Sequence, residues 1–201
     1  MVTSTPKRIA KTVLDFCRTI NPDASPQFVP VRPAIEAEQN ECFLNVETRI
    51  KSEGGSLVNG WCIWLWPQVF IEAEHHGVWK TVEGKLIDVS PKPQNEKKIV
   101  FLEDPSFAFS EVTFERVDNI RLNLTTDKDV QTFLDISAEY AAFIEKHSSG
   151  RIVNAPAQEL ASLEYAKARA LKKLFPRYTK PNDLCPCGSG KKNKKCHRIG
   201  L

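Results

Sequence analysis

Residues 60–91 read "GWCIWLWPQVFIEAEHHGVWKTVEGKLIDVSP" and indicate that an antiparallel sheet lies at the centre of the fold. The stretch is rich in β-branched and aromatic residues, which are typical of strands. Its "VEGK", at 82–85, predicts a hairpin turn, because glycine accepts the backbone angles of a tight turn. Together with "KKIVFLED" at 97–104, the stretch predicts three or four antiparallel strands.

Helices are predicted on both sides of these strands in the sequence. Apolar residues recur three or four positions apart, and prolines and glycines punctuate the pattern. The predicted helices cover residues 7–20, a segment that begins near Asn40 or Glu41 and ends at Gly54, residues 126–150, and a segment from Pro156 to Pro176. A weaker strand is predicted in "EVTFERV" at 111–117. We therefore predict an α+β protein, with a small antiparallel sheet and flanking helices.

The length and composition fit a globular protein with an appendage. A chain of 201 residues with 41% hydrophobic residues can bury a core. We predict an α+β body at 1–150, a basic helix and linker at 151–180, and a C-terminal motif at 181–201. No apolar run approaches the roughly 20 residues of a membrane span, and the N-terminus lacks the layout of a secretory signal. We expect a cytoplasmic protein.

Charge is unevenly distributed along the chain. Residues 165–201 hold eleven Lys and Arg and one acidic residue, while the rest of the chain holds 17 basic and 24 acidic residues. Any attraction to an anionic partner is therefore expected to come from the C-terminal segment.

That segment also contains a metal-ligand pattern, Cys185-x-Cys187-x8-Cys196-His197. Three sulfurs and one imidazole are the closed tetrahedral set of structural Zn²⁺, and the nearby lysines favour thiolates and offset their charge. Two alternatives are a disordered basic tail with incidental cysteines and a redox site. The second lacks the usual Cys-x-x-Cys spacing.

The segment "NDLCPCGSGKKNKKCH" at 182–197 closely resembles the SEC-C motif, which is named for the C-terminus of the translocation motor SecA and is appended to many unrelated bacterial proteins. The resemblance implies that Cys185, Cys187, Cys196 and His197 form a zinc knuckle. In SecA the module helps to contact the chaperone SecB and the ribosome. We therefore expect a protein or ribosomal partner, with nucleic acid as another possibility.

The body contains a candidate catalytic set in the order Cys42, His76, Asp88. Cys42 lies at the start of a predicted helix, where exposed amides favour the nucleophilic thiolate. His75 and His76 lie on one predicted strand, and Asp88 follows across the hairpin. A nucleophile, a base and an orienting carboxylate are thus available.

This order is similar to that of papain-like and transglutaminase-like thiol enzymes, in which the Cys begins a helix and the His and Asp lie on neighbouring strands. The resemblance covers residues 41–91 and implies that His76 is the base and Asp88 its partner. The Cys42 amide, Asn45 or Gln39 are candidate donors to an oxyanion. Two hypotheses follow: a thiol hydrolase or acyl-transfer enzyme, or a non-catalytic adaptor that uses the knuckle for docking.

Two weaker candidates lie on the same strands. Glu72, Glu74 and His76 alternate and could form a second metal site, although a solvent-facing stripe explains them equally well. The four tryptophans could line a cleft or belong to the core; they are Trp61, Trp64, Trp66 and Trp79.

Overall fold

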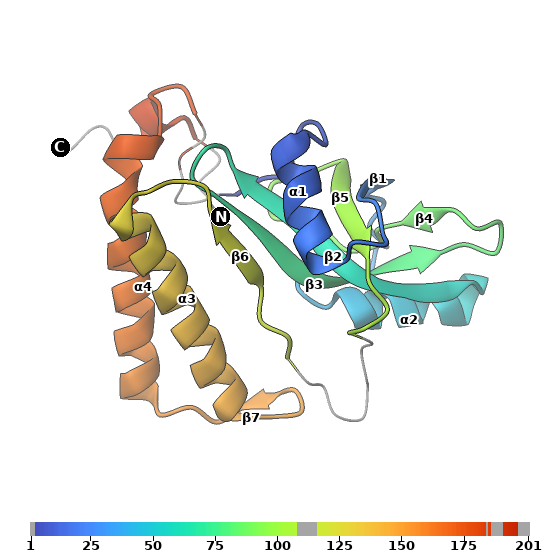
Figure 1. The fold of residues 1–201 in the computed structure, drawn as a ribbon. Coiled ribbons are helices and arrows are strands. Elements are labelled where there is room, and N and C mark those ends of the chain that lie inside the picture. Colours follow the sequence, from blue (N-terminus) through green and yellow to red (C-terminus); the bar gives the residue numbers. More distant parts are fainter. Residues whose placement is uncertain (1–2, 108–115, 184, 186–190, 197–201) are drawn as a thin grey trace. The chain divides into compact units, whose positions relative to one another are not determined.

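The structure is a computed structural model that describes residues 3–107, 116–183, 185 and 191–196 (Figure 1). It divides into two compact units. The sheet unit comprises Thr3–Leu65 and Ile71–Phe109, and the helical unit comprises Met1–Val2, Trp66–Phe70 and Ser110–Leu201. Helices accompany an antiparallel sheet, so the predicted α+β class is confirmed. The predicted division at residues 150 and 180 stays a prediction.

Five strands of the sheet unit lie in the order β1-β5-β2-β3-β4. Their bounds are Gln27–Pro30 for β1, Ser56–Trp66 for β2, Phe70–Lys80 for β3, Leu86–Ile87 for β4 and Lys98–Glu103 for β5. β5 pairs antiparallel with β1 and with β2, and β4 pairs antiparallel with β3. The turn between β3 and β4 contains Gly84 at φ 81°, in the left-handed region that favours glycine, as "VEGK" predicts.

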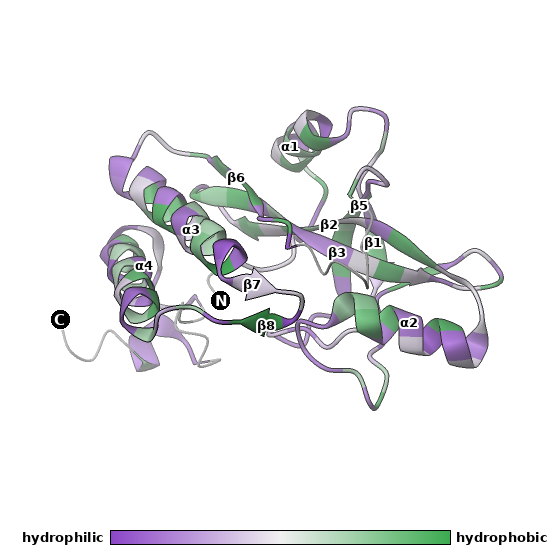
Figure 2. Cartoon of the chain, turned by 90° about the horizontal axis from the view of Figure 1, so that it is seen from below, coloured by the Kyte–Doolittle hydropathy of each residue, from purple (hydrophilic) through white to green (hydrophobic). Residues whose placement is uncertain are grey.

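Two helices, α1 (Lys11–Ile20) and α2 (Cys42–Glu53), flank this sheet (Figures 1 and 2). α2 begins two residues after Asn40, whose φ is 68°. It ends at Glu53, and the N–H of the next residue, Gly54, donates to Ile50 O at 2.9 Å. In Figure 2, hydrophobic residues gather at the start of α2 and hydrophilic residues at its end.

The core of the sheet unit is built mainly from strand residues. One buried cluster consists of Val29, Val31, Cys62, Trp64, Val78, Ile99 and Phe101. A second joins Val46 of α2 to Trp79 of β3 and to Val89. All four tryptophans are buried, so they belong to the core rather than to a cleft. The buried indole N–H groups of Trp61 and Trp64 donate to Asp104 and Glu74.

The helical unit contains β6 (Ile120–Asn123), α3 (Lys128–Lys146), β7 (Ser148–Ser149), β8 (Ile152–Val153), α4 (Ala157–Tyr178) and the 3-10 helix η1 (Asn193–Lys195). α3 and α4 pack together around a hydrophobic cluster formed by Trp66, Val69, Phe70, Val130, Phe133, Leu134, Ala170 and Leu174. The basic helix thus packs against α3 within its own unit.

Polar side chains at both ends of α3 explain where the helix begins and ends. The Asp127 carboxylate accepts from Asp129 N–H and caps the first turn. The helix ends at Lys146, before the predicted Gly150. His147 donates from Nδ1 to Phe143 O at 2.8 Å, and Ser148 donates to Ile144 O at 2.7 Å, so side chains bind the last carbonyls. Gly150, at φ 59°, lies in the turn between β7 and β8 instead.

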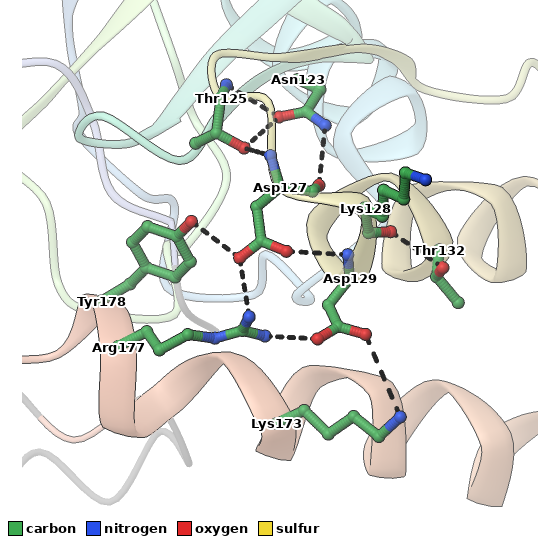
Figure 3. Close-up of polar contacts among 9 residues, drawn as sticks. All are labelled: Asn123, Thr125, Asp127, Lys128, Asp129, Thr132, Lys173, Arg177 and Tyr178. Atoms are coloured by element: carbon green, nitrogen blue, oxygen red, sulfur yellow. Dashed lines mark hydrogen bonds and ion pairs between the residues drawn. The ribbon is translucent and has the colours of Figure 1, made fainter.

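The predicted end of α4 at Pro176 is wrong, because the helix continues to Tyr178. Proline removes one N–H donor and crowds the carbonyl four residues earlier, but its fixed φ is itself compatible with a helix. Two contacts with the start of α3 hold the added residues (Figure 3): Arg177 lies 2.9 Å from Asp127 Oδ2, and Tyr178 donates its hydroxyl to the same oxygen at 2.9 Å.

Four short strands, β1, β6, β7 and β8, were not predicted. Each has four residues or fewer, too few for an alternating pattern to stand out. Most of the predicted strand at 111–117 lies outside the described residues. Among the described helices, none has the length and apolarity needed to cross a bilayer.

Candidate functional site

Asp88 is a fully buried carboxylate that follows β4 directly. Its backbone is fixed on both sides, because its N–H donates to Pro30 O at 2.9 Å and its carbonyl accepts from Arg32 N–H at 2.8 Å. Its Oδ1 accepts from Ser90 N–H at 2.9 Å. These contacts leave Oδ2 for charged partners.

His76 of β3 is one of these partners. Its Nε2 lies 3.1 Å from Asp88 Oδ2, and only 6% of its side chain is exposed. His75, the next residue along the strand, points elsewhere: its Nε2 donates to Phe107 O at 2.7 Å, and its ring packs on Phe43. Of the two adjacent histidines, His76 is therefore the one beside Asp88.

Lys92 is the second partner, and the sequence reasoning missed it. Its Nζ lies 2.6 Å from Asp88 Oδ2 and 3.1 Å from His76 Nε2, with only 6% of its side chain exposed. Lys92 stands between Pro91 and Pro93 in a segment without strand or helix pattern. Nothing there distinguishes it from a surface lysine, apart from its spacing of four residues from Asp88.

The three side chains shift one another's ionisation. Burial, the strongest influence on His76, lowers its pKa, and the Lys92 ammonium acts in the same direction. The Cys42 thiolate and the Asp88 carboxylate outweigh them and raise the pKa of His76 from 6.5 to about 9. Burial raises the pKa of Asp88, but His76 and Lys92 prevail and lower it. Near neutral pH the site therefore favours the charged form of each group.

Cys42 is the first residue of α2 and is half-buried. The electrostatic effect of its thiolate reaches His76, Lys92 and Cys62. Cys17 and Cys62, by contrast, are buried thiols, and burial raises the pKa of Cys17 to about 12 and that of Cys62 well above its ordinary value. The structure thus brings His76 and Asp88 into contact and Cys42 within electrostatic range of them.

Asn45, one turn after Cys42, ties α2 to the carboxylate segment. Its Nδ2 donates to Glu38 O at 2.8 Å and to Ser90 Oγ at 3.0 Å, and its Oδ1 accepts from Glu38 N–H. Both amide hydrogens are used, so Asn45 is a structural link rather than a donor to an oxyanion. The Cys42 amide and the exposed Gln39 side chain remain as candidates.

The suggested second metal site on β3 is already occupied by protein partners. Glu74 accepts from the Trp64 indole at 2.6 Å, Glu72 accepts from Thr3 at 3.4 Å, and His76 faces Asp88. In the described part of the chain, no group of three or more His, Cys, Asp and Glu side chains could hold a metal ion.

Two of the four predicted zinc ligands, Cys185 and Cys196, are among the described residues, whereas Cys187 and His197 are not. Backbone hydrogen bonds fold the two described stretches of this segment onto each other. Cys185 N–H donates to Lys191 O at 2.7 Å, and Asn193 N–H donates to Asp183 O at 2.8 Å. η1 ends directly before Cys196. This turn, with a donor set of three thiolates and one imidazole, fits structural Zn²⁺.

The lysines of this segment point to solvent. Lys191, Lys192, Lys194 and Lys195 are all exposed. They form a basic face beside the thiol donors, as their positions in the sequence predict.

Comparison with known proteins finds one similar protein and one matching family model. Over 138 residues, or 65% of this chain, the sequence is 24% identical to the protein translocase subunit SecA of Chloroflexus aggregans (strain MD-66 / DSM 9485). The match covers 14% of that protein's length. No solved structure matches the chain. None of these results supports the expected resemblance of the body to papain-like or transglutaminase-like enzymes. Residues 182–198 match the family model of the SEC-C motif, so the chain carries that motif.

Proposed function

We propose that the chain is a thiol hydrolase or acyl-transfer enzyme, in which Cys42 is the nucleophile, His76 the acid and base, and Asp88 the orienting carboxylate. The observation that carries this proposal is the buried contact of 3.1 Å between His76 and Asp88, within electrostatic range of a thiol at the start of a helix. Such a set serves attack on an amide or ester carbonyl.

The first half-reaction uses the charge-separated pair. The Cys42 thiolate attacks the carbonyl carbon, and the carbonyl electrons move to oxygen. As the tetrahedral adduct collapses, the His76 imidazolium gives its proton to the departing amine or alcohol, which leaves an acyl group on Cys42. His76 Nε2 faces Asp88, so Nδ1 is the nitrogen available for this transfer.

The second half-reaction reverses the proton movement. Neutral His76 takes a proton from water or from an acceptor amine, which attacks the acyl carbon and releases the Cys42 thiolate. The backbone N–H of Cys42, at the N-terminus of α2, can donate to the oxyanion in both steps. Cys42 and His76 return to their starting charges.

The SEC-C motif would hold one Zn²⁺ through Cys185, Cys187, Cys196 and His197. Zinc there is structural, because all four positions are protein ligands and none is left for substrate. We further propose that the protein acts in the cytoplasm, where reduced thiols are maintained, and that the motif docks it on a protein or ribosomal partner.

A second function is supported by the exposed lysines beside the thiol donors. In this alternative the chain is a non-catalytic adaptor, and its basic knuckle binds a protein or ribosomal surface while Cys42 and His76 have no chemical role. The match to SecA is compatible with either function.

An assay with a chromogenic ester distinguishes the enzyme from the adaptor. The full-length protein is mixed with p-nitrophenyl acetate, and acylated peptides are located by mass spectrometry. In samples quenched with acid at early times, before deacylation, the enzyme hypothesis predicts acetylation of Cys42 in native protein and in His75→Ala, at up to one group per chain, and much less in His76→Ala. Equal labelling of Cys42 in native protein and in His76→Ala would favour the adaptor.

A further inference from the structure

The proposed reaction makes contrary demands on His76. The imidazole must be positive to accompany the Cys42 thiolate and protonate the leaving group, yet neutral to accept a proton from water once Cys42 is acylated. A buried carboxylate beside it favours the positive form in both stages. By itself, Asp88 would therefore hinder the second half-reaction.

Lys92 changes this balance. Its ammonium lies 2.6 Å from Asp88 Oδ2, closer than the 3.1 Å between that oxygen and His76 Nε2. Both cations are almost completely excluded from solvent. The charges of Asp88 and Lys92 therefore cancel locally, and Asp88 keeps its role as a hydrogen-bond acceptor for the imidazole.

We infer that Lys92 is a positioning residue of the proposed site, which neutralises Asp88 so that His76 carries a positive charge only while Cys42 is a thiolate. The inference rests on the proposed function. When Cys42 is acylated, its negative charge disappears, and His76 becomes the neutral base that the second half-reaction needs. The loss of one charge on sulfur thus switches the role of the imidazole.

Lys92 acts on the imidazole through its charge. In the tautomer that the second half-reaction needs, Nε2–H donates to Asp88 and Nδ1 is free to accept a proton. An ammonium only donates, so Lys92 Nζ, 3.1 Å from Nε2, does not hydrogen-bond to that protonated nitrogen. Its positive charge disfavours the imidazolium and so favours the neutral ring.

Other ionisable groups near this cluster are buried or are held by partners of their own. Cys62 on β2 is fully buried, and burial raises the pKa of its thiol, which keeps it neutral. Glu74 on β3 is bound by the Trp64 indole, and burial lowers the pKa of His75. The groups that act on His76 are thus Cys42 on α2, Asp88 and Lys92.

The inference is tested by following the titration of His76 by NMR in the full-length protein. The chain has only four histidines, so a histidine-labelled sample gives few signals, and His76→Ala identifies the relevant one. The parent is Cys42→Ser, which removes the thiolate and imitates the neutral sulfur of the acylated state. Its His76 should titrate well below the native value of about 9.

Lys92→Gln in this parent keeps a donor for Asp88 but removes the charge. The His76 midpoint should then rise by about one pH unit or more, while Lys92→Arg should leave it near the parent value. An unchanged midpoint in Lys92→Gln would overturn the inference.

If Lys92→Gln does not fold, the double variant Lys92→Met, Asp88→Asn replaces it, because it removes both charges. Its midpoint should equal that of the parent, and a large fall would show that Lys92 had not cancelled Asp88. These titrations need no substrate and no reactive thiol. They therefore remain informative if acylation of Cys42 shows the proposed function to be wrong.

Discussion

Phe43 packs directly over Gly77, where a Cβ atom added to the glycine would lie 2.8 Å from the Phe43 ring. The two residues follow Cys42 and His76 in the sequence, so this contact fixes the start of α2 against β3 beside the proposed site. The Leu57 side chain, also at 2.8 Å, closes the other side of the space.

Gly77→Ala should therefore disturb the site as well as the fold. Overpacking of this kind costs about 1 to 3 kcal/mol of unfolding free energy. Displacement of Phe43 should also slow alkylation of Cys42. Urea denaturation and alkylation rates measure the two effects. Lys80→Ala, at an exposed position of β3, is the control and should change neither.

The lowered pKa of Asp88 predicts an acid-dependent loss of stability. Burial opposes the charge, but His76 and Lys92 prevail, so the folded pKa lies below the ordinary 3.8. The stabilisation is present above pH 3.8 and is lost as the pH falls through the folded value. Asp88→Asn should lower the unfolding free energy by about 3 to 5 kcal/mol at pH 7, because two buried cations lose their counter-ion.

This difference between native protein and Asp88→Asn should shrink in urea titrations at pH 3 and below. Asp23→Asn alters an exposed carboxylate and is the matched control, with little effect at either pH. A constant difference from pH 7 to pH 2 would contradict the assignment of the charge to Asp88.

In the helical unit, Asp127 should contribute more to the unfolding free energy than its ion-pair partner, Arg177. Asp127 caps α3 and also accepts from Tyr178, so Asp127→Ala should lower the unfolding free energy measurably. Arg177→Ala should lower it less, because the arginine side chain is 43% exposed and water screens its ion pairs. Urea unfolding of both variants gives the order. A larger effect for Arg177 would mean that the ion pair, and not the cap, holds the helices together.

The zinc assignment predicts one Zn²⁺ per full-length chain by elemental analysis. Cys196→Ser and Cys187→Ser should each lower the metal content and the affinity for zinc, because a four-ligand site loses a thiolate. Cys42→Ser is the matched cysteine control and should keep one zinc per chain. Full zinc content in Cys196→Ser would exclude this cysteine as a ligand.

The candidate site could be predicted in part because its elements are local in sequence. The "VEGK" turn brings β4 back along β3, which places Asp88 across the hairpin from His76, and the start of α2 fixes the surroundings of Cys42. Lys92 could not be found in this way. Its inward direction depends on the buried charge of Asp88, and Asp88 is itself held by hydrogen bonds to residues 30 and 32, almost sixty positions away.

The end of α4 illustrates the same limit. A local rule places the end of the helix at Pro176, but Asp127 and Asp129, about fifty residues earlier, bind Arg177 and extend it. Contacts between distant segments here outweigh the preference of a single residue.

The central claim is that His76 activates Cys42. It is tested most directly by the rate of Cys42 alkylation with iodoacetamide between pH 5 and pH 9, read peptide by peptide with mass spectrometry. Native protein and His75→Ala should react rapidly at pH 6, and His76→Ala should react at least about tenfold more slowly there. Identical pH profiles for native protein and His76→Ala, each rising only as an ordinary thiol ionises, would contradict the account.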